Sequence, residues 1–169
     1  IRDSLMAFVR SFLKPGMTFV DVGANIGLYS MLGASLVGSE GRVFAVEPNS
    51  ENCRLLLLSA DRNGADQFTL HPVACGPERG YAAIRTALGS NGGFIESEGE
   101  AMLDPTAMVV PVAPLDDLVD GPVDLIKIDV EGAEALVVSG ANRIIDEQRP
   151  TVISEFSQEM LNRVSGVQA

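Results

Sequence analysis

The sequence has few cysteines, few aromatic residues and no long apolar run. Its 169 residues include two cysteines, Cys53 and Cys75, and no tryptophan. This pair has no metal-ligand spacing, which excludes a cysteine-based metal site and a disulfide framework. We therefore expect two buried free thiols, which are typical of a reducing cytoplasm. No apolar run approaches the roughly 20 residues that a membrane helix needs, so we expect no membrane partner.

Clusters of basic side chains are also missing. Twelve lysines and arginines face 23 aspartates and glutamates, which gives a net charge of −11, and the basic residues are scattered. Neutralising nucleic-acid phosphates requires a clustered basic face, so the sequence argues against DNA or RNA and favours a small-molecule partner. Hydrophobic residues make up 46% of the chain. A disordered chain is therefore excluded, and the length suits one domain with a sizeable core.

The pattern of the chain is organised around one stretch near its start. An apolar strand is predicted at Thr18–Val22, a turn with two glycines at 23–27, and a helix from Leu28 onward. A strand, a glycine turn and a helix form the first unit of a nucleotide-binding α/β fold. Glycines in the turn can take positive φ and let a ligand approach the backbone. The N–H groups at the helix start favour a carboxylate or phosphate, and Asp21 directs a further carboxylate to the same crevice.

The elements that follow alternate between helix and strand. Such alternation predicts a doubly wound, mostly parallel sheet with right-handed crossovers, in one domain spanning 1–169. The expected elements are a helix within 1–14, strands at 43–46 and 67–71, a helix at 51–63 capped by Asn49 or Ser50 and ended by Gly64, a short helix at 115–118, a buried strand at 123–129, a helix ending near Gly140, and a last strand at 151–156.

The middle of the chain departs from this alternation. Residues 78–112 are predicted as a hairpin and loop insertion, with short strands at Tyr81–Thr86 and Met108–Val112. Between them, the polar and glycine-rich stretch Gly89–Pro105 has no clear periodicity and is long for a compact domain. Two interpretations stay open for it, a lid over the substrate or a solvated loop without a role.

A single acid at the end of the second strand carries the nucleoside hypothesis. Glu47 comes twenty residues after Gly27, where an acidic side chain can accept hydrogen bonds from both hydroxyls of a ribose. In the turn, Asn25 occupies the second glycine position of a dinucleotide fingerprint, which disfavours a pyrophosphate. S-adenosylmethionine fits better, because its amino-acid end lies at the turn and Asp21 can hold the ammonium. The predicted cofactor-binding residues are Asp21, Gly23, Ala24, Asn25, Gly27, Glu47, Pro48, Asn49 and, with Val73 and Cys75 beside the adenine, Ala74.

Three blocks of sequence strengthen this hypothesis. F-V-D-V-G-A-N-I-G-L-Y-S, V-F-A-V-E-P-N and D-L-I-K-I-D-V-E-G-A-E resemble the signature blocks of the FkbM-type family of S-adenosylmethionine-dependent methyltransferases, over roughly Leu13 to Phe156. The resemblance implies a Rossmann-like class I methyltransferase fold and methyl transfer to a hydroxyl oxygen of a sugar, polyketide or similar small molecule. It also implies a seven-stranded sheet that ends in an antiparallel hairpin. Thirteen residues follow Phe156, so we expect the C-terminal strands to be incomplete.

Acidic residues after the fourth strand are the catalytic candidates. Asp129 is the first choice and Glu131 the second, because a carboxylate near the acceptor can orient it or take its proton. Glu131 and Glu134 also fit the first turn of a helix, where the dipole alone favours acids. Glu155 and His71 are weaker candidates, and Lys127 is expected to pair with an acid. No resident metal is predicted.

Two other functions share the same strand, turn and acid. A nicotinamide-dependent oxidoreductase uses a similar unit, although Asn25 argues against it. A non-catalytic module that retains the fold for binding is the other alternative. The sequence leaves the methyl acceptor and the oligomeric state open.

Overall fold

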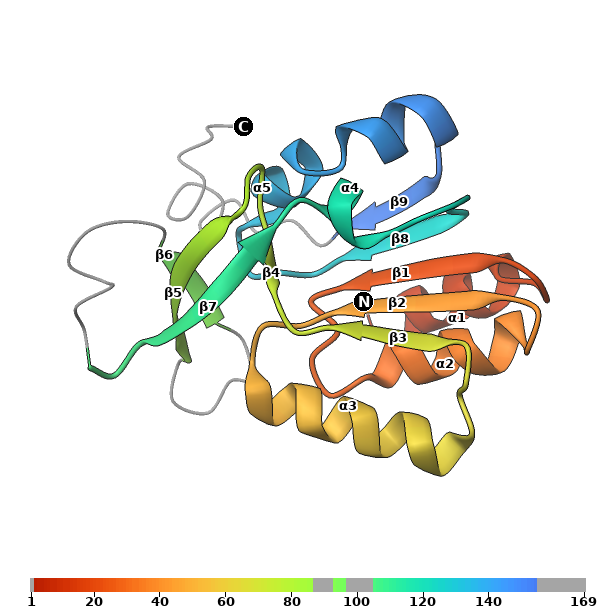
Figure 1. Ribbon diagram of the computed structural model, residues 1–169. Helices are drawn as coiled ribbons and strands as arrows, with labels where there is room; N and C mark the ends of the chain where they lie inside the picture. Colours follow the sequence, from red (N-terminus) through yellow and green to blue (C-terminus); the bar gives the residue numbers. More distant parts are fainter. Residues whose placement is uncertain (1, 87–92, 97–104, 155–169) are drawn as a thin grey trace.

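The computed structural model describes residues 2–86, 93–96 and 105–154, and the account below concerns these residues. A five-stranded parallel sheet forms the centre of the molecule (Figure 1). Its strands lie in the order β3 (Phe68–His71), β2 (Arg42–Val46), β1 (Thr18–Val22), β8 (Leu125–Ile128) and β9 (Thr151–Ser154). The predicted doubly wound, parallel sheet is confirmed. Strand order reverses between β1 and β8, and ligands of such sheets bind beyond the carboxyl ends of the strands at this point.

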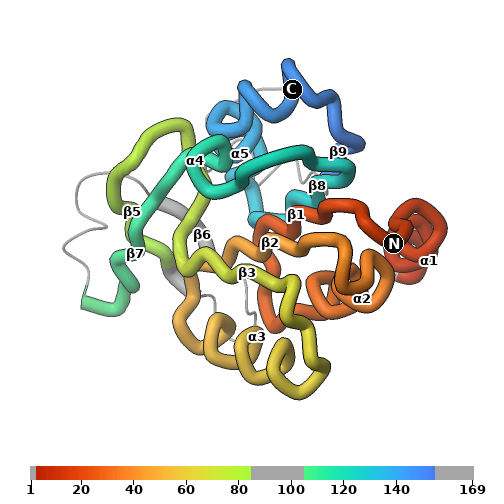
Figure 2. Tube along the Cα trace, turned by 45° about the vertical axis from the view of Figure 1, so that its right-hand side comes forward, coloured from red at the N-terminus to blue at the C-terminus, as the bar shows by residue number. Residues whose placement is uncertain are grey.

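Both faces of the sheet are covered, as the continuous burial of β1 requires. On one face, α1 (Arg2–Phe12) and α2 (Leu28–Val37) pack with Phe19, Val43 and Leu125. The opposite face packs its alternate strand residues against α4 (Leu115–Leu118), α5 (Glu134–Ser139) and a π-helical turn (Ile144–Gln148). In Figure 2, α3 (Ser50–Asn63) lies beside the β3 edge. None of the described helices is long and apolar enough to cross a membrane.

The second sheet is smaller and was only partly expected. It has the order β4 (Ala74–Cys75), β7 (Met108–Ala113), β5 (Gly80–Thr86) and β6 (Gly93–Glu96). The predicted pair of strands is present as β5 and β7, which are antiparallel. The prediction of an aperiodic stretch at Gly89–Pro105 was wrong where β6 pairs with β5, because a four-residue strand is too short to show a period. Residues 89–92 and 97–104 of that stretch lie outside the described residues. The same holds for residues 155 and 156 of the expected last strand, which include the candidate Glu155, and for the expected C-terminal hairpin.

The long helix α3 begins and ends where capping residues stand. The Asn49 side chain accepts hydrogen bonds from the N–H groups of Glu51 and Asn52, and Gly64 ends the helix in the left-handed conformation. Both caps were predicted. Cys53 is buried in this helix and Cys75 in β4, and both thiols are free as expected. Burial raises the pKa of Cys53 to about 11 and that of Cys75 to about 12.

Asn49 is both the helix cap and a predicted cofactor-binding residue. A stability measurement tests the capping role by itself. We expect Asn49→Ala to lower the free energy of unfolding by about 1 kcal/mol, because two N–H groups at the start of α3 lose their acceptor. Asn49→Ser retains a capping oxygen and is expected to stay close to the wild type. Urea denaturation checks both variants, and equal stability of the alanine variant and the wild type would contradict the capping role.

Candidate functional site at the strand ends

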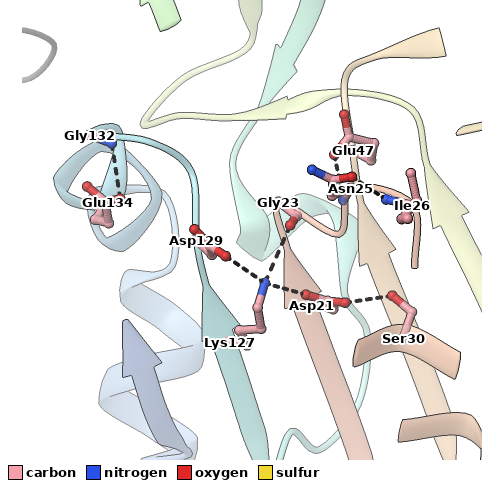
Figure 3. Close-up of polar contacts among 10 residues, drawn as sticks. All are labelled: Asp21, Gly23, Asn25, Ile26, Ser30, Glu47, Lys127, Asp129, Gly132 and Glu134. Atoms are coloured by element: carbon pink, nitrogen blue, oxygen red, sulfur yellow. Dashed lines mark hydrogen bonds and ion pairs between the residues drawn. The ribbon is translucent and has the colours of Figure 1, made fainter. Parts of the chain in front are cut away.

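The candidate site lies where β1, β2 and β8 end, at the reversal of strand order (Figures 1 and 3). The backbone turn 23–27 joins β1 to α2 here. Glu47 follows β2, and Asp129 follows β8. Three stretches that are far apart in the sequence therefore bring their polar residues to one edge, as the sequence predicted.

The glycine turn has an unusual backbone conformation and is hydrogen-bonded to β2. Gly23 (φ 74°), Asn25 (φ 53°) and Gly27 (φ 92°) all have positive φ, the region that favours glycine. The N–H groups of Gly23 and Ala24 both donate to the Val46 carbonyl, at 2.9 and 3.1 Å. A Cβ on Gly23 would overlap the backbone oxygen of Asp129, and one on Gly27 would contact Leu56. The turn thus lies so close to Asp129 and Leu56 that there is no room for a side chain at Gly23 or Gly27.

The sequence predicted anion donors at the start of the helix, and the N–H groups of the preceding turn already have partners. The Asn25 N–H donates to Glu47, the Ile26 N–H to the Asn25 side chain at 2.7 Å, and the Gly27 N–H to the Ala24 carbonyl at 2.9 Å. The start of α2 has glycine at its N-cap and no side-chain cap. The predicted contact of a cofactor carboxylate with this helix start stays a prediction.

Glu47 connects the turn to the start of α3. Its buried carboxylate accepts hydrogen bonds from the N–H of Asn25 (2.8 Å, Oε2), the N–H of Asn49 (2.9 Å, Oε1) and the side chain of Asn52 (3.2 Å, Oε1). Burial raises the pKa of Glu47, although these three donors lower it. A carboxylate accepts about four hydrogen bonds, so one site on Oε2 is left for a further donor such as a ribose hydroxyl. That role stays a prediction.

Asp21, Lys127 and Asp129 form a charged cluster beside the turn (Figure 3). Asp21 is fully buried and accepts from the Lys127 ammonium at 3.0 Å and from the Ser30 hydroxyl at 2.7 Å. The Lys127 Nζ also lies 3.4 Å from the Gly23 carbonyl and 3.7 Å from Asp129 Oδ2. Burial lowers the pKa of Lys127, but Asp21 and Asp129 raise it more, so the net shift is upward and the ammonium is retained.

This cluster changes the picture of Asp21 that the sequence suggested. The expected pairing of Lys127 with an acid is confirmed. Asp21 was expected to face the crevice, but its carboxylate lies inside the sheet and both oxygens have protein partners. Its contact with a cofactor ammonium is untested. Ser30 was missed, because no local pattern links it to a strand residue nine positions earlier.

The acids of the D-V-E-G-A-E block take three different positions. The Asp129 side chain is 40% exposed and faces the cluster. Glu131 is exposed and has φ 53°, in a turn that precedes α5, so its expected place in the first helical turn was wrong. Two consecutive left-handed residues, Glu131 and Gly132, delay the helix until Glu134. Glu134 is buried and accepts from the Gly132 N–H at 3.1 Å, which stabilises the turn.

The remaining candidates lie around this centre. Ala74 is buried in β4, and Pro48 is half-buried beside Glu47. The His71 ring stacks on Phe44 at 6.1 Å between centroids, and burial lowers its pKa, so a packing role fits this histidine. Within 2–86, 93–96 and 105–154, no three His, Cys, Asp or Glu side chains are placed to hold a metal ion.

Comparisons with known proteins agree with this geometry. The family model described as the methyltransferase FkbM domain matches residues 21–165. Among solved structures, the methyltransferase FkbM of Methylobacillus flagellatus KT is similar, with a TM-score of 0.59 and 21% identity over 96% of this chain. This chain spans 44% of the length of that protein. No protein among those with curated functions matches the sequence.

Other solved structures share the fold at lower identity. An rRNA methylase of Streptococcus thermophilus has a TM-score of 0.56 and 13% identity, covering 98% of this chain and 78% of its own. A SAM-dependent methyltransferase of Aquifex aeolicus has a TM-score of 0.50 and 14% identity, covering 97% of this chain and 76% of its own. At such identities the likeness shows the fold alone.

Proposed function

This chain belongs to the methyltransferase FkbM domain family, and on that premise we propose that it binds S-adenosylmethionine and methylates a hydroxyl oxygen of a small molecule. The observation that carries the proposal is the turn after β1, locked by Glu47 at the reversal of strand order. A sugar or a polyketide-like compound is the acceptor class that the sequence resemblance favours.

The residues of the site suit an in-line displacement. S-adenosylmethionine, when bound, supplies a methyl group activated on a sulfonium sulfur. The acceptor oxygen would bond to that methyl carbon as the carbon–sulfur bond breaks, with the electron pair of the broken bond going to the sulfur of S-adenosylhomocysteine. The Asp129 carboxylate, which is 40% exposed, orients the acceptor hydroxyl and takes its proton. Glu131, exposed on the next turn, is the second candidate for this contact.

Charge supports a small acceptor over a nucleic acid. An rRNA methylase shares this fold, so the fold does not decide between the two acceptor classes. The chain has a net charge of −11, and the described site contributes Asp21, Asp129 and Glu47 against one lysine, Lys127. Phosphate backbones are repelled by such an excess of carboxylates. The two free thiols support a cytoplasmic location.

Ligand binding tests the proposal directly. At a concentration of about 100 times its Kd, S-adenosylhomocysteine is expected to stabilise the native state by about 2.7 kcal/mol. That corresponds to a rise in Tm of about 5–10 °C for a chain of this size. NADH serves as the control and is expected to give no shift. Absence of S-adenosylhomocysteine binding in calorimetry would contradict the proposal, and a shift with NADH alone would favour an oxidoreductase.

A further inference from the structure

Lys127 is a fully enclosed charge in an otherwise apolar strand. Its side chain is 3% exposed, and its neighbours in β8, Leu125, Ile126 and Ile128, are all buried and apolar. Replacing a buried ion pair by well-packed apolar residues is often neutral or stabilising. Stability alone therefore does not explain why an ammonium and the Asp21 carboxylate occupy the centre of this sheet.

The three oxygen atoms around the ammonium indicate another role. Nζ donates to Asp21 of β1 and to the Gly23 carbonyl in the turn, and it faces the Asp129 carboxylate after β8. These oxygen atoms come from both sides of the reversal point, as Figure 3 shows. One side chain thus joins the proposed cofactor turn to the proposed catalytic acid.

The cluster also fixes where its charge lies. Asp21 and Asp129 each carry one negative charge and Lys127 one positive charge, which leaves a net charge of −1. Asp21 is neutralised inside the protein by Lys127 and by the Ser30 hydroxyl. The uncompensated negative charge is therefore at Asp129, the one carboxylate of the cluster that reaches solvent.

We propose that Lys127 is a positioning residue that holds the Asp129 carboxylate near the methyl–sulfonium group of the bound cofactor, within reach of the acceptor hydroxyl. The inference rests on the proposed function. Lys127 itself is too enclosed to touch a substrate, so it acts through Asp129. By orienting that carboxylate, Lys127 places one negative charge near the positively charged sulfonium of S-adenosylmethionine. S-adenosylhomocysteine has no sulfonium and therefore lacks this positive charge.

The preference for one cofactor form over the other measures this effect. A carboxylate beside the sulfur strengthens binding of S-adenosylmethionine but leaves that of S-adenosylhomocysteine nearly unchanged, so the ratio of the two Kd values reports its position. General loosening of the site weakens both ligands and leaves the ratio constant. Both ligands carry the same amino-acid ammonium group. If a change at Asp21 weakens the contact with that group, it weakens both ligands equally and cancels in the ratio.

The variants are chosen so that the fold survives. Lys127→Met alone would leave the buried Asp21 carboxylate without its cation, and such an uncompensated charge strongly destabilises a protein. Asp21→Asn/Lys127→Gln replaces the ion pair by two neutral groups that can hydrogen-bond to each other. Lys14→Gln is the matched control, because Lys14 is exposed and is the only other lysine in the chain. Circular dichroism and thermal melting confirm folding before titration.

Calorimetric titration with both ligands then completes a mutant cycle. We expect Asp129→Asn to lower the preference for S-adenosylmethionine about two- to fivefold, and Asp21→Asn/Lys127→Gln to lower it equally. The triple variant should show no further loss, and Lys14→Gln no loss. A wild-type ratio in the folded double variant, or independent effects in the triple variant, would overturn the role of Lys127. Failure of the wild type to bind either ligand would instead overturn the proposed function, and this inference with it.

Discussion

Replacing Glu47 by alanine is expected to weaken S-adenosylhomocysteine binding by about 100-fold. Hydrogen bonds to a charged group contribute about 1.5–3 kcal/mol each, and about 1.4 kcal/mol corresponds to a tenfold change in Kd. The variant loses the proposed contact with the ribose. It also removes the acceptor of the Asn25 N–H, whose nitrogen lies 2.8 Å from Glu47 Oε2 and ties the turn to this residue. Calorimetry on the purified variant measures the loss.

One further variant tests whether the charge of Glu47 is needed, and another serves as a control. Glu47→Gln retains the shape, but its amide NH₂ group faces one of the N–H groups of Asn25 and Asn49 that now donate to Glu47. We therefore expect binding nearly as weak as in the alanine variant. Glu51→Ala is the matched control, because it removes an exposed acid from the first turn of α3, the helix that follows Glu47. Wild-type-like binding by a folded Glu47→Ala variant would remove Glu47 from the site.

Local sequence patterns predicted the framework of the site, because turns and helix ends depend on the residue types at a few neighbouring positions. The turn after β1 requires glycine at positive φ, and Gly23 and Gly27 stand at two of its three such positions. The caps of α3 are Asn49 and Gly64, residue types that favour those two positions for stated steric and hydrogen-bonding reasons. The burial of Phe19, Val20 and Val22 in β1 followed from an apolar run in a parallel sheet.

Long-range pairing is what the patterns did not contain. The hydrogen bond between Lys127 and Asp21 joins residues 106 positions apart, and the burial of Asp21 depends on it. Nothing in the local pattern around Asp21 marks this partner. Glu131 was misplaced for a related reason, since non-glycine residues rarely take the left-handed conformation that delays α5. The strand β6 exists through its pairing with β5, not through its own four residues.

The largest effect on stability is expected at Gly23, where the turn and the catalytic candidate share one contact. A Cβ at this position overlaps the backbone oxygen of Asp129, and the residue has φ 74°. Positive φ costs an alanine about 1–2 kcal/mol, and overpacking costs about 1–3 kcal/mol more. Gly23→Ala should therefore lower the free energy of unfolding by about 2–5 kcal/mol, measured by urea denaturation.

Gly64→Ala is the control that separates the two causes of this loss. Gly64 has φ 59°, but nothing lies within 4 Å of a Cβ placed there, so only the conformational cost of about 1–2 kcal/mol applies. Equal losses in the two variants would contradict the close contact between the turn and Asp129. A larger loss at Gly23, together with lost S-adenosylhomocysteine binding in protein that is still folded, is the expected result. The backbone that carries Asp129 would then be shown to set the shape of the cofactor turn, because relieving the overlap must displace both.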